Sequence, residues 1–464
     1  MTDSHGKRHG QTHHQLSMNL EKGGLRNESD SVHPSLILVY IFLGLIALGT
    51  FALWLPPATT SGKESSFITA LFTATSAASG TGLIVIDTVS YWSPFGQQVI
   101  LGLIQLGGLA ALIGFSLFLL RIARHTTGEE KFLLRESMHV SSGKGIAGLI
   151  VGIVLYALIV EAAGTWFLFR HFSADQPQSV ALWMGLFHSI SAFNNAGFDA
   201  IGLANYGTDS VVNLVLAGLV VLGGISFMAI VEIVQVRRFF RLSLDTKLVL
   251  TASAWLLGLG TLVIFWGEYS NPQSLAPMSF LQKLQAAFFF SANARTAGLA
   301  TIDMGNFAVP TMFLIVFLMF IGGSSGSTAG GIKINTFGLL VAATRSSIRG
   351  DKEVELLGSR AHREQINRAI AITFLSVILV SAITFVLTIT DRFPLRELVF
   401  EVISAFSTTG FSTGITPDLS IWGKLLIIFT MFAGRVGPLT LAFALAHRAP
   451  LTRYSYTQEA INLG

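Results

Sequence analysis

The sequence contains no cysteine, which excludes disulfide bonds, thiol catalysis and cysteine-ligated metal sites. It also contains few charges: Asp, Glu, Lys and Arg make up 12% of the 464 residues, whereas soluble proteins have about 25%. Hydrophobic residues account for 51%. This balance excludes an ordinary soluble globular protein and predicts an integral membrane protein.

The apolar residues form runs long enough to cross a hydrocarbon core about 30 Å thick. The first run is full length and lacks the small-residue cleavage site of a signal peptide, so we expect it to remain as a helix. The polar segment before it, 1–33, predicts a disordered cytoplasmic tail, and we assign its histidines no function. In all, the runs predict eight transmembrane helices, near residues 35–54, 95–120, 146–169, 211–234, 247–266, 311–321 continuing past a glycine-rich break, 368–390 and 422–446.

A Phe followed ten residues later by a Gly recurs four times, at Phe72 and Gly82, Phe187 and Gly197, Phe288 and Gly298, and Phe400 and Gly410. The glycines are 115, 101 and 112 residues apart, so each repeat is a subdomain. About a dozen residues before each Gly look helical, which suits a re-entrant half-helix and is too short for a span. We therefore predict an all-α fold in which four units of helix, half-helix, loop and helix surround a pseudo-fourfold central pore, at residues 34–125, 145–240, 245–348 and 364–447.

The basic residues predict the orientation of these units, because Lys and Arg accumulate in short cytoplasmic loops. Of 30 Lys and Arg, 21 lie in the N-terminal segment, between the units or near the C-terminus, and six lie on the opposite side. Both termini, including the tail 448–464, are therefore expected to be cytoplasmic. The net charge of +4 follows from this bias, so nothing favours a nucleic-acid partner. Three cations, Arg295, Lys333 and Arg435, remain within the membrane region.

The segments around the four glycines, TSAASGTGL, SAFNNAGFD, NARTAGLAT and AFSTTGFST, consist mainly of small and polar residues. Non-helical backbone at membrane depth is tolerated only where it is buried in protein or lines a water-filled cavity. Four such loops around one axis could form rings of carbonyl oxygens that replace the hydration shell of an alkali cation. For a single loop, glycine could equally serve only close helix packing. Four loops at matched spacing favour the ion-binding interpretation.

The last helix of the third unit is interrupted by GGSSGSTAGG at residues 322–331, called here the glycine-rich loop. Each unpaired backbone group in hydrocarbon costs several kcal/mol, so this loop should face a water-filled pore. The glycine pairs at 107–108 and 223–224, which occupy the matching level of units one and two, predict close packing only.

Arg435 lies at the same level in the fourth unit, within FAGRVGPLT. An Arg in mid-membrane costs roughly 2.5–3.5 kcal/mol and usually faces the interior of the bundle. We expect it to project into the pore and to hydrogen-bond the glycine-rich loop, the alternative being a snorkelling surface Arg. Lys333 could hold the end of that loop or reach cytoplasmic water.

The sequence allows three other interpretations. An intramembrane enzyme could use His188 with Ser189 or Ser191, but the spacing places no acid partner nearby, so the chain is not expected to be an enzyme. The glycine-rich loop lacks the GK[ST] ending of a nucleotide-binding loop. A secondary transporter that couples K⁺ to Na⁺ or H⁺ by alternating access is the nearest alternative, although such folds usually contain inverted repeats, whereas these four are parallel.

From about residue 35 to its end the chain resembles the Trk/Ktr/HKT superfamily of cation transporters, and most closely the pore-forming membrane subunit of bacterial Ktr potassium-uptake systems. The matching segments are FTATSAASGTGLIVIDT, FHSISAFNNAGF, ANARTAGL, IGGSSGSTAGGIKI, GRVGPLTLA and the ending RYSYTQEAINLG. One departure is Gly80, where family members commonly carry a β-branched residue. It makes the first loop softer and leaves the selectivity between K⁺ and Na⁺ open.

The resemblance implies a selectivity filter whose backbone oxygens bind K⁺, and a gate below it. Arg295 would brace its loop instead of facing the ions, with Glu401 as a candidate partner. The filter residues would be Ser79, Gly80, Thr81, Gly82, Asn194, Asn195, Ala196, Gly197, Arg295, Thr296, Ala297, Gly298, Ser407, Thr408, Thr409 and Gly410. The gate would comprise Gly322, Gly323, Ser324, Ser325, Gly326, Ser327, Thr328, Ala329, Gly330, Gly331, Lys333 and Arg435.

The resemblance also implies the protein's surroundings. It implies a homodimer in the bacterial inner membrane, with one pore per subunit and the C-terminal tail at the dimer interface. A cytoplasmic RCK-type (KtrA-like) subunit that binds ATP or ADP would control the gate, and Na⁺ could activate transport. The basic loops 121–144 and 345–368 are the expected contact surface for that subunit, although anionic membrane lipid would attract them as well. No organic cofactor is expected in this chain.

Overall fold

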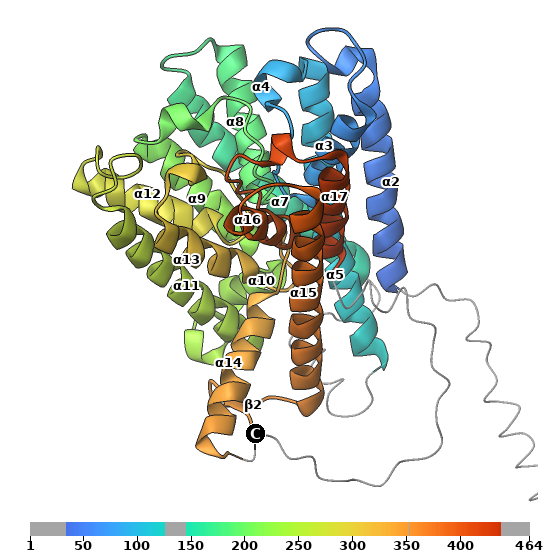
Figure 1. Cartoon of the computed structure of the whole chain (residues 1–464). Coiled ribbons are helices and arrows are strands. Elements are labelled where there is room, and N and C mark those ends of the chain that lie inside the picture. Colours follow the sequence, from blue (N-terminus) through green and yellow to red (C-terminus); the bar gives the residue numbers. More distant parts are fainter. Residues whose placement is uncertain (1–33, 126–144, 352, 438–464) are drawn as a thin grey trace, which may run out of the picture.

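The computed structural model describes residues 34–125, 145–351 and 353–437, and these residues are mostly α-helical (Figure 1). Predictions for the two tails and for the loop 126–144 lie outside the described residues. The helices of unit 1 are α2 (Pro34–Trp54), α3 (Phe67–Ser79), α4 (Thr88–Tyr91) and α5 (Pro94–His125), with the 3-10 turn η1 (Pro56–Ala58). Those of unit 2 are α7 (Gly145–Phe172), α8 (Gln178–Phe193), α9 (Ser210–Gly224) and α10 (Phe227–Val236), with η2 (Leu203–Tyr206) and η3 (Phe239–Arg241).

Units 3 and 4 follow the same order. Unit 3 contains α11 (Leu244–Glu268), α12 (Phe280–Asn293), η4 (Met304–Asn306), α13 (Val309–Phe320) and α14 (Ile334–Arg349). A short antiparallel hairpin of β1 (Glu355–Leu356) and β2 (Ser359–Arg360) leads to unit 4. Unit 4 contains α15 (Arg363–Thr390), α16 (Leu395–Ser407), η5 (Thr416–Asp418) and α17 (Ile421–Val436).

Among the described residues, five helices, α2, α5, α7, α11 and α15, have the length and apolar composition of a membrane span. The predicted span at 211–234 is bent: α9 and α10 together have the length and apolar composition of a span, but they meet at an angle of 95°. The carbonyls of Gly223 and Gly224, at the break, accept hydrogen bonds from the glycine-rich loop, so the bend leaves no orphan acceptors there. Helix α13 stops at that loop, as expected, and the last predicted span is described only as far as α17 extends.

The half-helices α3, α8, α12 and α16 each lie between helices of their own unit and one helix of the preceding unit. Helix α5 contacts α8, α9 contacts α12, α13 contacts α16, and α17 contacts α3. This order returns to the first unit, so the C-termini of the half-helices lie around a common centre. Large apolar side chains such as Trp255, Phe313 and Phe374 are exposed on the outside, where lipid would cover them.

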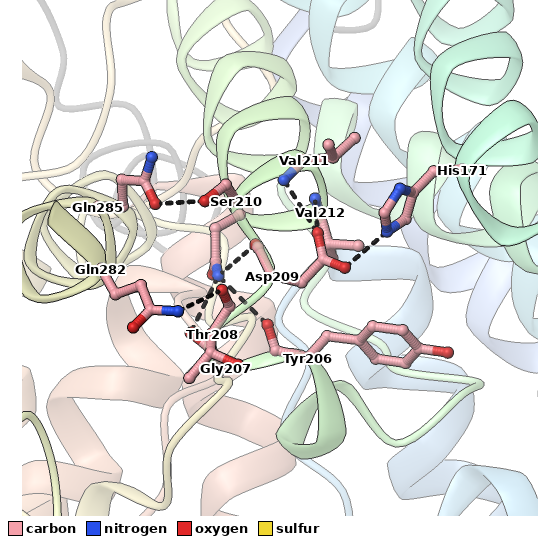
Figure 2. Close-up of polar contacts among 11 residues, drawn as sticks. His171, Tyr206, Gly207, Thr208, Asp209, Ser210, Val211, Val212, Gln282 and Gln285 are labelled. Atoms are coloured by element: carbon pink, nitrogen blue, oxygen red, sulfur yellow. Dashed lines mark hydrogen bonds and ion pairs between the residues drawn. The ribbon is translucent and has the colours of Figure 1, made fainter. Parts of the chain in front are cut away.

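A polar cluster ties the N-terminus of α9 to its neighbours (Figure 2). Asp209 accepts hydrogen bonds from two backbone N–H groups in the first turn of α9, and its other oxygen lies 2.6 Å from Nε2 of His171 on α7. The hydroxyl of Ser210 donates to Gln285 on α12 at 2.6 Å. The loop between α8 and α9 therefore joins unit 2 to unit 3 at this end.

Candidate functional site

The loops that follow the four half-helices meet one another. We number them loop 1 (79–82), loop 2 (194–197), loop 3 (295–298) and loop 4 (407–410). The last Gly of each loop lies against a carbonyl oxygen of the next loop. The distances from an added Cβ to that oxygen are 2.6 Å for Gly82 to Ala196, 2.5 Å for Gly197 to Ala297, 2.0 Å for Gly298 to Thr409 and 2.1 Å for Gly410 to Thr81. The contacts run from loop 1 through loop 4 and back to loop 1, so the loops close a ring of backbone.

Each loop has positive φ at two positions, its last residue, which is a Gly, and the residue two before that Gly. The φ values are 62° and 85° at Gly80 and Gly82, 52° and 71° at Asn195 and Gly197, 143° and 63° at Thr296 and Gly298, and 51° and 94° at Thr408 and Gly410. Residues at positive φ change the direction in which neighbouring peptide groups point, so this alternation can aim several carbonyls at one centre. Side chains at such positions store about 1–3 kcal/mol of strain each.

At the first of these two positive-φ positions, loop 1 has Gly80, whereas the other three loops have a residue with a side chain. At +62° Gly80 adopts without strain the conformation that Asn195 and Thr408 adopt at a cost. Its added Cβ would lie 3.4 Å from the carbonyl oxygen of Asn194, so loop 1 has space for a side chain there. Whether Gly80 softens the loop, as the sequence suggests, stays a prediction.

The backbone hydrogen bonds of three loops are alike. The N–H groups of Thr81, Ala196 and Thr409 donate to carbonyls five residues earlier, at 2.8, 2.8 and 2.9 Å. In loop 3 the N–H groups of Ala297 and Gly298 both donate to Asn293, at 3.0 and 3.2 Å. Loop 3, which holds Arg295, is thus wound more tightly at its start.

The expected pair of Arg295 and Glu401 is wrong. Arg295 is buried, and its Nε and Nη1 have no hydrogen-bond partner among the described residues. The carboxylate of Glu401 accepts instead from the hydroxyl of Thr416 at 2.8 Å, the N–H of Thr413 at 3.1 Å and the hydroxyl of Ser412. Glu401, on α16, therefore holds residues 412–416, which follow loop 4, against the half-helix.

His188 occupies in unit 2 the position that Glu401 occupies in unit 4. It has an acidic partner, Asp199, which the sequence spacing did not indicate. Its Nε2 lies 3.1 Å from Oδ1 of Asp199, just beyond loop 2. Burial raises the pKa of Asp199, but the hydrogen bond and charge of His188 and the backbone N–H donors outweigh it, so the pKa lies below its usual range. The hydroxyls of Ser189 and Ser191 donate to carbonyls of Glu161 and Phe198. This arrangement braces loop 2 and aligns no nucleophile with the imidazole.

The glycine-rich loop lies against the ring. The hydroxyl of Thr328 is 2.9 Å from the carbonyl oxygen of Gly223 and accepts from Asn195 Nδ2 at 2.7 Å. The N–H of Ser324 donates to Gly224 at 3.0 Å. A Cβ added at Gly330 would meet Oγ1 of Thr408 at 2.1 Å. The glycine-rich loop is therefore held directly against loops 2 and 4.

Arg435 hydrogen-bonds the glycine-rich loop, as the sequence predicts. Its Nη1 donates to the carbonyl of Thr328, and its Nη2 donates to the carbonyl of Gly107 in α5 at 3.3 Å. Its side chain is buried, which excludes a surface Arg. Lys333 donates to the carbonyl of Ala329, so it holds the end of the loop. Together these contacts join the glycine-rich loop to units 1, 2 and 4.

Sequence reasoning missed Glu161, a buried carboxylate on α7. Its two oxygens accept from Asn194 Nδ2 at 2.9 Å and from Gln105 Nε2 at 3.0 Å. The signal was present, since Glu161 is the single acidic residue in the apolar run 146–169. An ionisable residue inside a span is a functional candidate by default.

The predicted role of the glycine pairs in packing can be tested on Gly107. A Cβ there would lie 2.0 Å from the carbonyl oxygen of Ala78 in α3, whereas one at Gly102 in the same helix meets nothing within 4 Å. We expect Gly107→Ala to lower the thermal unfolding midpoint by several degrees, because α3 must shift, and Gly102→Ala to leave it within about 2 °C. Equal midpoints for the two variants, measured in the same detergent, would refute close packing at Gly107.

Comparison with known proteins agrees with this architecture. The model of the family TrkH, cation transport protein, matches residues 13–455. The chain is 38% identical over 415 residues to the Ktr system potassium uptake protein B of Bacillus subtilis, covering 89% of this chain and 93% of the relative. It is 34% identical to the potassium/sodium uptake protein NtpJ of Enterococcus hirae, covering 93% and 97%. The crystal structure of the potassium transporter TrkH from Vibrio parahaemolyticus has the same fold, with a TM-score of 0.72 at 17% identity over 91% of this chain and 86% of that chain.

Proposed function

The chain belongs to the TrkH family of cation transport proteins, and on this premise we propose that it carries potassium into the bacterial cell through a carbonyl-lined pore in the inner membrane. The Bacillus subtilis relative and a Ktr system protein B of Vibrio alginolyticus, 34% identical, are potassium uptake proteins, and NtpJ is a potassium/sodium uptake protein. The permeant ion is accordingly K⁺, and the degree of discrimination against Na⁺ is the property to measure.

The closed ring of loops 1–4 is the observation that carries this proposal. Four carbonyl-bearing loops, each packed on the next by a Gly at positive φ, can surround a dehydrated cation with backbone oxygens. Each loop has one Gly at the close contact, so fewer constraints fix the cage than in a filter with paired glycines. We therefore expect moderate discrimination among K⁺, Rb⁺ and Na⁺.

The glycine-rich loop and Arg435 are proposed to form the gate. The loop contacts loops 2 and 4 on the side where Arg435 donates to Thr328. In this position it obstructs the path of an ion leaving the ring, and the guanidinium repels a cation that approaches. Opening requires the loop to release the hydrogen bonds of Thr328 and Arg435.

Uptake needs no coupled ion in this scheme. An inside-negative potential contributes about 2.3 kcal/mol per charge for every 100 mV. Sodium would act as an activator only. The regulatory part is proposed to be a separate cytoplasmic RCK-type subunit, consistent with relatives named as components of Ktr systems. The chain is proposed to work as a homodimer with both termini cytoplasmic.

The test is ⁸⁶Rb⁺ uptake into proteoliposomes that contain the purified chain, with empty liposomes as the control. We expect uptake that K⁺ inhibits more strongly than Na⁺, driven by potential alone with equal Na⁺ concentration and pH on both sides. Uptake that requires a Na⁺ or H⁺ gradient would instead support the coupled transporter. No uptake by folded protein, with or without a regulatory subunit from a Ktr system, would contradict the proposal.

A further inference from the structure

Glu161 lies behind loop 2 and is 4% exposed. Neither of its oxygens is paired with a cation: among the described residues Glu161 takes part in no salt bridge. Its two partners are the neutral amides of Asn194 and Gln105. A buried carboxylate without a counter-ion is costly, and here two N–H donors, one on each oxygen, stabilise its ionised form.

The network connects this carboxylate directly to the ring. Asn194 is the first residue of loop 2, and its Nδ2 also lies 2.9 Å from Oε1 of Gln105. Its side chain packs closely on Gly108, where an added Cβ would lie 1.9 Å from its Oδ1. The carbonyl oxygen of the same residue lies 3.4 Å from the Cβ position of Gly80 in loop 1. One residue thus contributes its side chain to Glu161 and its backbone to the ring.

Both partners of Glu161 are N–H donors, so the network needs two acceptor oxygens at this position. A Gln would keep one acceptor and turn an amide N–H toward a second donor, and rotating Gln105 would turn its Nε2 toward Asn194 Nδ2, which now donates to its Oε1. Glu thus provides both acceptors, and with them a negative charge one side chain away from the loop. In a low-dielectric site such a charge acts on a cation more strongly than it would in water.

We propose that Glu161 is a positioning residue that fixes loop 2 through Asn194 and supplies negative potential that stabilises the permeant cation in the ring. The inference rests on the proposed function of the four loops. The charge of Glu161 is opposite in sign to that of Arg435, whose Nη2 bonds the carbonyl of Gly107, next to Gly108.

The test compares Glu161→Gln with the exchange Glu161→Asp, which keeps the charge and both acceptor oxygens. Asn194 is left in place, because its Nδ2 also donates to the carbonyl of Ile190 at 2.9 Å. We expect Glu161→Gln to raise the half-saturating ⁸⁶Rb⁺ concentration about tenfold, which corresponds to about 1.4 kcal/mol. Glu161→Asp should keep it within about threefold of wild type. Glu268→Gln is the matched control, since Glu268 is fully buried, is held by Asn271, Ser274 and the N–H of Ala308, and touches none of loops 1–4.

A thermal unfolding measurement with and without Rb⁺ separates loss of ion binding from loss of folding. Rb⁺ bound in the ring raises the thermal unfolding midpoint by mass action, and this shift should shrink in Glu161→Gln and be kept in Glu161→Asp. Wild-type affinity in Glu161→Gln would overturn the inference, as would an equal loss in Glu161→Asp. In both cases ⁸⁶Rb⁺ uptake by the wild type would leave the proposed function intact, whereas absence of wild-type uptake would remove both.

Discussion

Proteoliposomes that contain Arg435→Ala should take up ⁸⁶Rb⁺ at least about tenfold faster than those with the wild type. A unit charge within about 5 Å of the ion path opposes a cation by about 3 kcal/mol at an effective dielectric constant of about 20. Removing it also removes the hydrogen bonds to Thr328 and Gly107, so the glycine-rich loop loses its hydrogen-bonded link to α17 and α5. Initial rates at one imposed potential measure the effect.

Two further variants distinguish loss of the charge at Arg435 from a nonspecific effect of substitutions in α17. Arg435→Lys keeps the charge and loses the planar donor pair, so its uptake should stay closer to wild type than to Arg435→Ala. Lys424→Ala removes a cation from the same helix, where Lys424 donates to the carbonyl of Pro417, and should leave uptake unchanged. Equal uptake by wild type and Arg435→Ala would refute the gating role of the guanidinium.

Gly410→Ala should reduce ⁸⁶Rb⁺ uptake by about tenfold or more, or abolish the preference for K⁺ over Na⁺. The added methyl would lie 2.1 Å from the carbonyl oxygen of Thr81 and 3.0 Å from Cα of Gly82, both backbone atoms of loop 1. Neither can yield without opening the ring. Because the contact passes from loop to loop, one substitution displaces carbonyls in two of them.

Gly414→Ala is a close control, because Gly414 has nearly the same φ of 95° against 94° for Gly410 and has nothing within 4 Å of its Cβ position. Both variants carry a similar cost of left-handed backbone, about 1–2 kcal/mol. Only Gly410→Ala intrudes on the ring. If both variants lose transport equally, strain and not the ring contact would explain the defect. Uptake and ion competition are measured on the same preparations, and the unfolding midpoint of each variant is measured to show that both are folded.

The sequence indicated those features that backbone chemistry determines. Glycines at matched positions in four units predicted the loops. The place of Arg435 at the level of the glycine-rich loop, together with the family resemblance, predicted its bond to that loop. The break between α9 and α10 was not predicted, since it depends on hydrogen bonds to Ser324 and Thr328, about 100 residues later.

Side-chain partners across units were harder to predict. Glu401 was paired with Arg295 because both are charged and lie near adjacent loops, yet its oxygens are satisfied locally by Ser412, Thr413 and Thr416. Glu161 was overlooked because its partners, Gln105 in α5 and Asn194 in loop 2, lie far from it in the sequence. Periodicity and spacing indicate which face of a helix a residue lies on, but not which of several nearby polar groups is its hydrogen-bond partner.

The most direct test of the account is the location of bound ions. Crystals of the protein grown in Rb⁺ should show anomalous difference peaks along the centre of the ring formed by loops 1–4, within coordination distance of their backbone oxygens, and replacement of Rb⁺ by Na⁺ should weaken the occupancy of those sites. Rb⁺ sites found elsewhere, with none inside the ring, would contradict the proposal that these carbonyls select the transported ion.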